Sequence, residues 1–154
     1  MEIKILEAKP NDWEIIQNLM DPLFTSEIDN DEDLDMEWVH SKEGFKYCKE
    51  IAKGIGGLCY IAYADNIPVG FIALHEKDFG YRKSKYIEVG SLGVNPEYRS
   101  HGIGKLLIEE AGKWAKKKNA SKLYVSVYSK NSKGLNFYEK NDFYQIGVEM
   151  DKKL

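Results

Sequence analysis

The stretch Val94-Asn-Pro-Glu-Tyr-Arg99-Ser-His-Gly102-Ile-Gly104 decides how this chain is interpreted. An apolar segment ends at Val94, and helical spacing of apolar residues begins at Ile103. A strand that turns through glycines into a helix presents free backbone N–H groups, and the helix dipole adds partial positive charge there. Glycine also lets a bulky phosphate approach the main chain closely. The stretch therefore predicts a site for a nucleotide-like diphosphate, with Arg99 as an additional fixed charge.

Two other phosphate-binding motifs do not fit this stretch. A P-loop would need glycine at position 99 and Ser or Thr at position 106, where the chain has Arg99 and Leu106. The dinucleotide-binding fingerprint would need a third glycine where Leu107 stands. The pattern that remains is Arg-x-x-Gly-x-Gly after Val-x-Pro-x-Tyr, for which an ordinary glycine-started helix is the alternative interpretation.

Length and composition limit the class of protein. The chain has 154 residues, of which 43% are hydrophobic, so we expect one domain over residues 1–154 with a sizeable core. No apolar run is long enough to cross a membrane and the N-terminus does not resemble a signal peptide, so we expect a cytoplasmic protein without membrane contact. Cys48 and Cys59 have no metal-ligand spacing and are expected to be buried free thiols. The three histidines are scattered, and no metal site is predicted.

The net charge of −3 hides an uneven distribution. Residues 27–37 hold seven acidic side chains and no Lys or Arg, whereas residues 99–154 hold twelve Lys or Arg against six Asp or Glu. The basic half favours an anionic cofactor and the acidic segment favours a cationic substrate, although both could be solvated surface. A nucleic-acid binder is not favoured, because the lysines are spread around helices without an aromatic platform.

The hydrophobic pattern predicts ten elements. Strands are predicted over residues 2–7, 58–64, 69–74, 85–94, 123–128 and 144–151. Helices are predicted from residue 11 or 12 to near Pro22, over 41–53, from the glycines to Lys118, and from 131 or 132 to 141. The order β-α-α-β-β-β-α-β-α-β predicts a single-domain α/β fold with a mixed sheet.

A second motif follows in Asn131-Ser-Lys-Gly134-Leu-Asn-Phe137-Tyr138-Glu-Lys-Asn-Asp142-Phe143. With Arg99–Gly104 and the element order, it resembles the GNAT N-acetyltransferase superfamily, whose second motif usually reads Asn-x-x-Ala-x-x-Phe-Tyr-Glu-Lys-x-Gly-Phe. Gly134 replaces the common Ala, which weakens the helix by roughly 1 kcal/mol. Asp142 replaces a glycine with positive φ, which Asp tolerates better than most residues. The resemblance implies a mostly antiparallel sheet with a bulged, V-shaped split between central strands and helices on both faces.

The resemblance also implies acetyl-CoA as co-substrate. Its pyrophosphate is expected beside Arg99, on the loop and helix start formed by Ser100, His101, Gly102, Ile103, Gly104 and Lys105. Its pantetheine arm is expected to pair with the backbone of Leu92, Gly93 and Val94, and Gly90 and Gly93 fit a bulge or a close backbone approach there. Asn131 is expected to hydrogen-bond the arm and to cap its helix.

For catalysis, the resemblance implies direct attack of a primary amine on the thioester in a ternary complex. Tyr138 is the candidate general acid at the CoA sulfur, with packing as its alternative role. Glu88 is the candidate general base. In a regular strand it would share one face with Tyr86, Gly90 and Leu92, but a bulge would change which residues share that face. An outward, solvated side chain is the alternative interpretation of Glu88.

The sequence motifs say less about the acceptor and about binding partners. The acidic segment 27–37 falls where family members build the acceptor site, so we expect a cationic small molecule or peptide amine: a polyamine, an aminoglycoside, or a protein lysine or N-terminus. A mobile acidic loop is the alternative. A non-catalytic acyl-CoA-binding sensor is the alternative function. Homodimers are common in the family, but nothing in this sequence localises an interface.

Overall fold

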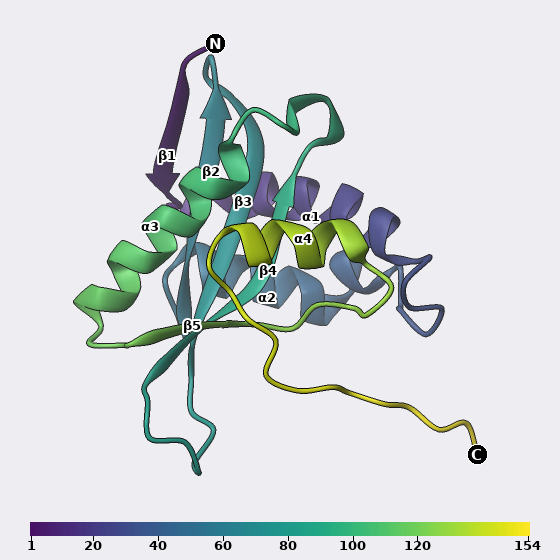
Figure 1. Ribbon diagram of the computed structural model, residues 1–154. Coiled ribbons are helices and arrows are strands. Elements are labelled where there is room, and N and C mark those ends of the chain that lie inside the picture. Colours follow the sequence, from purple (N-terminus) through teal and green to yellow (C-terminus); the bar gives the residue numbers. More distant parts are fainter.

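A five-stranded sheet forms the centre of the computed structural model, which describes residues 1–154 (Figure 1). The strands lie in chain order: β1 (Ile3–Glu7), β2 (Gly57–Ala64), β3 (Ile67–Lys77), β4 (Tyr86–Val94) and β5 (Lys122–Val125). The first four are antiparallel to their neighbours, and β5 is parallel to β4. The mixed, mostly antiparallel sheet predicted from the sequence is confirmed.

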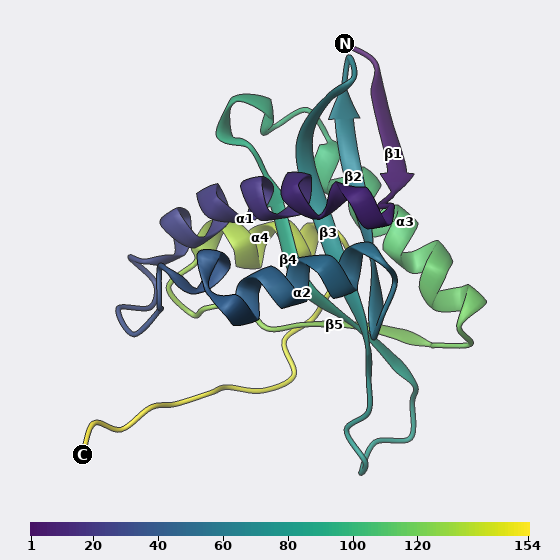
Figure 2. The same cartoon turned by 180° about the vertical axis from the view of Figure 1, so that it is seen from behind.

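Helices cover both faces of the sheet. Helices α1 (Trp13–Glu27) and α2 (Lys42–Ala52) lie on one face, and α3 (Ile103–Lys117) and α4 (Ser132–Lys140) lie on the other (Figures 1 and 2). Short 3-10 turns occupy Pro10–Asp12, Trp38–His40 and Pro96–Tyr98. None of the helices is both long enough and apolar enough to cross a membrane.

Each face of the sheet has its own hydrophobic core, because neighbouring residues of a strand point to opposite faces. Under α3, Ile72, Ile87 and Val89 are buried with the apolar face of that helix. Under α1 and α2, Phe71, Ala73 and Cys59 are buried against those two helices. Cys48 lies in the same second core, so both cysteines are buried free thiols as predicted, and burial raises the pKa of Cys48 to about 11.

Helix α1 is longer than predicted. The sequence predicted an end near Pro22, but the helix continues to Glu27 with Pro22 inside it. Proline removes one backbone donor from the helix. The apolar face on either side of it stays packed, with Met20 buried before it and Leu23 partly buried after it. This packing offsets the lost hydrogen bond, which local sequence rules do not capture.

Strand β4 carries the predicted bulge and split. Ala73 of β3 pairs with Ser91 while its neighbour Leu74 pairs with Val89, so Gly90 is the extra residue. On its other side β4 pairs with β5 only from Tyr86 to Val89. From Gly90 to Val94 it continues without a partner on that side. The two strands therefore diverge at the bulge.

The predicted last strand, 144–151, is wrong. Residues after Phe143 form no strand, and the chain extends away from the domain (Figure 1). Its alternation of apolar and polar residues has the period of a strand, but a strand is stable only when its backbone groups are paired with a neighbour. No backbone hydrogen bond within the chain involves residues 144–154.

Candidate active site

The loop between β4 and α3 exposes a row of backbone donors. Gly102, at the N-cap of α3, has φ +77°, and Ser100 has φ +64°. No backbone N–H from Ser100 to Lys105 donates a hydrogen bond within the protein. Donors at the start of a fifteen-residue helix suit a diphosphate, so the predicted residues Ser100, His101, Gly102, Ile103, Gly104 and Lys105 fit the pyrophosphate of CoA.

Side chains around this loop hold its shape. Arg99 Nε donates to the Val94 carbonyl at 2.9 Å, which ties the loop to the end of β4. His101 Nδ1 lies 2.8 Å from the Arg99 carbonyl, so its ring contacts the backbone of its own loop. At Gly104 a Cβ would lie 2.9 Å from the Phe137 ring, so this glycine also allows α3 to approach α4 closely.

The predicted pantetheine-binding residues form the open side of β4. Leu92, Gly93 and Val94 pair with β3 on one side and have no strand partner on the other. A Cβ at Gly93 would lie 3.0 Å from the Phe71 ring, which explains the glycine by packing. The unpaired side offers backbone donors and acceptors to a peptide-like arm, and it leads directly into the loop at Arg99.

Tyr138 and Asn131 come from α4. The Tyr138 ring lies between Phe137 and Phe143, with ring centroids 5.1 and 5.2 Å away. Burial, and secondarily the charge of Glu27, raises the pKa of Tyr138, which keeps the phenol protonated at neutral pH. Asn131 Oδ1 accepts the Gly134 N–H at 2.8 Å, which confirms the predicted cap. A Cβ at Gly134 would lie 2.4 Å from the Asn131 amide, so the glycine leaves room for this cap.

Glu88 faces a pocket of about 500 Å³ on the α1 and α2 side of the sheet. Its strand neighbours Ile87 and Val89 are buried in the opposite core, which sets its direction. The bulge at Gly90 then places Ser91 on the same face as Glu88, so both line the pocket, while Leu92 packs on the other face. Glu88 and Leu92, which would share one face in a regular strand, therefore lie on opposite faces. Glu88 also lies 3.5 Å from Lys77 Nζ.

Aromatic rings form one wall of the pocket. Phe24 stacks on Trp38 with centroids 5.8 Å apart, and Trp38 lies 5.7 Å from Tyr47. Tyr47 Oη is 2.8 Å from His75 Nε2. Burial raises the pKa of Tyr47, so this phenol is neutral.

Two glycines make room for the His75 ring. A Cβ at Gly90 would lie 2.7 Å from the ring, and one at Gly57 would lie 2.9 Å from its Nδ1. Both residues are on strands next to His75, so the imidazole occupies a slot between them.

The acidic segment closes the pocket. Asp31, Asp33 and Asp35 line it together with Glu88. Tyr128 donates to Asp31 at 2.7 Å across 97 residues, and this bond is the main reason that the pKa of Tyr128 is raised to about 12. The aspartates also shape the loop, because Asp35 accepts the Glu37 N–H at 3.0 Å.

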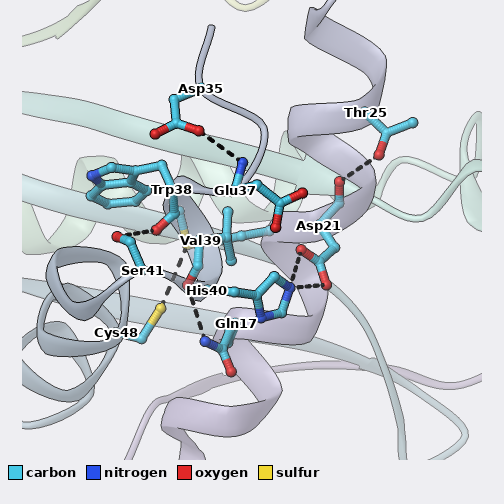
Figure 3. Close-up of polar contacts among 11 residues, drawn as sticks. Gln17, Asp21, Thr25, Asp35, Glu37, Trp38, Val39, His40, Ser41 and Cys48 are labelled. Carbon is cyan, nitrogen blue, oxygen red and sulfur yellow. Dashed lines mark hydrogen bonds and ion pairs between the residues drawn. The ribbon is translucent and has the colours of Figure 1, made fainter.

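Figure 3 shows how the chain after Asp35 is fixed to α1. Gln17 donates to the Val39 carbonyl at 3.0 Å, and His40 lies 2.9 Å from Asp21. Ser41 caps α2 by accepting the Gly44 N–H at 3.1 Å and donates to the Trp38 carbonyl. These bonds hold Trp38 at the pocket.

The structure thus brings the predicted residues of β4 and the glycine loop together in two groups, and Asn131 and Tyr138 come from α4. Residues 92–94 and 99–105 form one continuous stretch, and Glu88 joins the acidic segment in the pocket. The sequence alone did not identify four residues as part of the site: Trp38, Tyr47, His75 and Tyr128. Trp38 follows the acidic run directly, which is a usable clue, but the Tyr47–His75 and Tyr128–Asp31 pairs join residues far apart in the chain.

Residues 13–143 match the acetyltransferase (GNAT) family. Over 107 residues, 68% of the chain, the sequence is 36% identical to a spermidine N(1)-acetyltransferase of Thermoplasma acidophilum, and the match covers 62% of that protein. An uncharacterized N-acetyltransferase of Archaeoglobus fulgidus is 32% identical over 83 residues, 53% of the chain and 56% of that protein. The chain therefore spans less than two thirds of the length of either relative.

Solved structures share the fold. A mutant of the BH1408 protein of Bacillus halodurans superposes with a TM-score of 0.81 at 18% identity, covering 98% of this chain and 99% of that one. The aminoglycoside acetyltransferase AAC(6')-Iy, in complex with a bisubstrate analog of CoA, has a TM-score of 0.80 at 18% identity, covering 100% and 99%. The family match over residues 13–143 agrees with the glycine loop before α3 and the split strand β4, and it leads to one conclusion: the chain belongs to the GNAT acetyltransferase family.

Proposed function

We propose that this protein transfers an acetyl group from acetyl-CoA to a primary amine of a cationic acceptor. One observation carries the proposal: an acidic, aromatic-lined pocket that includes Glu88 meets the unpaired side of β4 at Gly90 and Ser91. An acceptor amine in the pocket and a thioester along β4 would lie next to each other. A domain that only bound CoA would not need the acidic pocket.

The co-substrate would be held along its length by groups already described. Backbone N–H groups from Ser100 to Lys105 would bind the pyrophosphate, with Arg99 beside them. The open side of Leu92–Val94 would pair with the pantetheine arm, and Asn131 at the start of α4 would hydrogen-bond the arm through its Nδ2, since its Oδ1 already caps the helix. A backbone N–H of β4 near the bulge would polarise the thioester carbonyl.

Glu88 and Tyr138 would each carry out one of the two proton transfers. Glu88 takes the proton from the acceptor ammonium, directly or through a water molecule, which frees the lone pair for attack on the thioester carbon. The C–N bond forms and the C–S bond breaks. Tyr138 donates its phenolic proton to the departing thiolate and regains one from solvent; a tyrosine hydroxyl is protonated at neutral pH, so the proton is present.

The pocket suits an acceptor with more than one positive charge. Four carboxylates, those of Asp31, Asp33, Asp35 and Glu88, line it, and ammonium groups also bind the faces of aromatic rings such as Trp38. The spermidine N(1)-acetyltransferase relative agrees with a polyamine as acceptor. An aminoglycoside, or a lysine or N-terminus of a protein, has the same charge chemistry.

A non-catalytic acyl-CoA sensor is the competing function. It is tested by incubating the purified protein with acetyl-CoA and separate amines, and by measuring the release of free thiol. The amines are spermidine, an aminoglycoside, a lysine-containing peptide, and a peptide with a free N-terminus. We expect release above the hydrolysis background with at least one of them. Tight acetyl-CoA binding without release for any amine would favour the sensor.

Neutralising the pocket tests the acceptor class. Replacing Asp31, Asp33 and Asp35 together with Asn removes three charges but retains the side-chain oxygens that shape the loop. We expect KM for the best cationic amine to rise at least ~10-fold, since each lost charge contact is worth roughly 1 kcal/mol, with kcat little changed. Asp29→Asn together with Glu32→Gln is the control, because these two acids do not line the pocket. An unchanged KM for every amine would refute the acidic acceptor site.

A further inference from the structure

One hydrogen bond joins the acidic segment to the other half of the domain. The Tyr128 hydroxyl donates to Asp31 Oδ2 at 2.7 Å. Tyr128 lies between β5 and α4, whereas Asp31 lies between α1 and α2. Every other hydrogen bond of residues 30–37 stays within residues 27–40. This bond is therefore the only one that holds the segment against the part of the chain that follows β5.

Both carboxylate oxygens of Asp31 are engaged within the protein. Oδ1 accepts the Asp33 N–H at 3.0 Å, and Oδ2 accepts the Tyr128 hydroxyl. The bond to Asp31 is the main reason that the pKa of Tyr128 is raised to about 12, so the phenol remains a donor at neutral pH. Asp31 thus links the backbone of the segment to the Tyr128 side chain.

The other two aspartates of the pocket have oxygens to spare. Asp33 is exposed and lines the pocket, and its carboxylate takes part in no hydrogen bond or ion pair within the chain. Asp35 accepts the Glu37 N–H through Oδ1, which leaves Oδ2 without a partner. Carboxylate oxygens of this kind can accept hydrogen bonds from an ammonium group of a ligand. The three aspartates of the pocket are therefore not equivalent.

Tyr128 is itself held by the start of α4. Its carbonyl accepts the Asn131 N–H at 2.9 Å, and the Asn131 side chain caps the helix. The end of α1 lies near the same region, because the charge of Glu27 is a further cause of the raised pKa of both Tyr128 and Tyr138. The phenol thus projects from a fixed turn, from which it can hold a loop in place.

We propose that Tyr128 is a positioning residue of the acceptor pocket, which fixes the acidic segment through Asp31 so that Asp33 and Asp35 meet the acceptor. The inference rests on the proposed function and divides the work among the aspartates. Asp31 acts through its two hydrogen bonds, and Asp33 acts through its charge. Without the Tyr128 bond, an acceptor would have to order the segment as it binds, which lowers its affinity.

The first test measures hydrogen–deuterium exchange of residues 30–34 by mass spectrometry, without any ligand. We expect Tyr128→Phe to speed this exchange about tenfold, because a hydrogen bond to a charged acceptor is lost. Asp31→Ala should have the same effect, and adding Tyr128→Phe to it should change little further. Tyr81→Phe, at a tyrosine that is 81% exposed, is the control and should exchange like the wild type. Unchanged exchange in Tyr128→Phe would overturn the proposal.

The second test separates position from charge by thiol release with spermidine, or with the amine of the panel that reacts fastest. We expect Tyr128→Phe to raise KM for the amine about three- to tenfold, with kcat and the Kd of CoA each changed less than about twofold. Asp31→Asn should raise KM less than about twofold, because its carbonyl can accept the Asp33 N–H while its amide donates to the Tyr128 oxygen.

Asp33→Asn is the matched change at the aspartate without a partner, and it should raise KM about three- to tenfold. The same KM in Asp31→Asn and Asp33→Asn, or an unchanged KM in Tyr128→Phe, would overturn the proposal. If no amine releases thiol, the proposed function fails and the role in acceptor binding fails with it. The exchange measurement would then still decide whether Tyr128 fixes the segment.

Discussion

Single residues carry the proton transfers of the proposed reaction. Tyr138, the proposed proton donor, lies between two aromatic rings, and burial raises its pKa, so its hydroxyl is protonated at neutral pH. Tyr138→Phe keeps the ring packing and removes only the hydroxyl. We expect kcat to fall by on the order of 10²-fold, as for loss of a general acid, while the Kd of CoA from calorimetry changes less than about twofold. Tyr81→Phe is the control, because Tyr81 is exposed. If kcat is unchanged, Tyr138 has only a packing role.

Glu88 is tested in the same way from the acceptor side. Gln has the shape of Glu but cannot accept the ammonium proton. We therefore expect Glu88→Gln to lower kcat by on the order of 10²-fold in a thiol-release assay, with CoA affinity retained. Glu76→Gln makes the same change at a neighbouring exposed glutamate whose partner is Lys85. Equal activity of the two variants would exclude Glu88 as the base.

Sequence motifs predicted two local backbone features, but they did not predict why particular glycines are needed. The positive φ at Asp142 and the cap at Asn131 were predicted and are confirmed. The motif could not show that Gly104 makes room for Phe137 or that Gly134 makes room for the Asn131 amide. Those reasons lie in contacts that form only when the helices pack.

At the scale of elements, the bulge in β4 assigns residues to the two faces. Without Gly90 as an extra residue, Glu88 and Leu92 would face the same side; with it, Glu88 faces the acceptor pocket and Leu92 faces the opposite core. The sequence predicted a bulge from its glycines but not the pairing register that fixes it. The predicted helix end near Pro22 and the predicted last strand were wrong for a related reason. Packing and the presence of a partner strand decide whether such elements form.

A side chain at Gly90, the extra residue of the bulge, should therefore disturb the pocket wall at His75. A methyl group at this position would lie 2.7 Å from the His75 ring, so Gly90→Ala must displace the imidazole from Tyr47. We expect KM for the amine to rise about three- to tenfold, equivalent to roughly 1 kcal/mol, with CoA affinity unchanged. In a His75→Ala background the clash is absent, so Gly90→Ala should then have little further effect in a double-mutant cycle. Additive effects would show that Gly90 acts without His75.

At the scale of the whole molecule, the proposed CoA site is built from elements that are far apart in the sequence. It runs from the open side of β4 through the glycine loop to α3, where Phe137 of α4 approaches Gly104. The proposed acceptor pocket lies on the α1 and α2 face of the sheet, over the second core. The resemblance predicted helices on both faces of the sheet, whereas the aromatic wall depends on pairings between residues far apart in the chain.

Binding at such a site should stabilise the entire domain. CoA at about 100 times its Kd would add about 2.7 kcal/mol to the free energy of unfolding, a rise in Tm of about 5–10 °C for a domain of this size. Gly102→Ala should reduce that rise, because φ +77° is strained for Ala and the loop donors would be redirected. Gly112→Ala, within α3 and with open space at its Cβ, should raise the Tm of the free protein and leave the CoA-induced rise intact. Differential scanning calorimetry of the three proteins with and without CoA measures both quantities. The same CoA-induced rise in Gly102→Ala as in the wild type would mean that the pyrophosphate does not bind at this helix start.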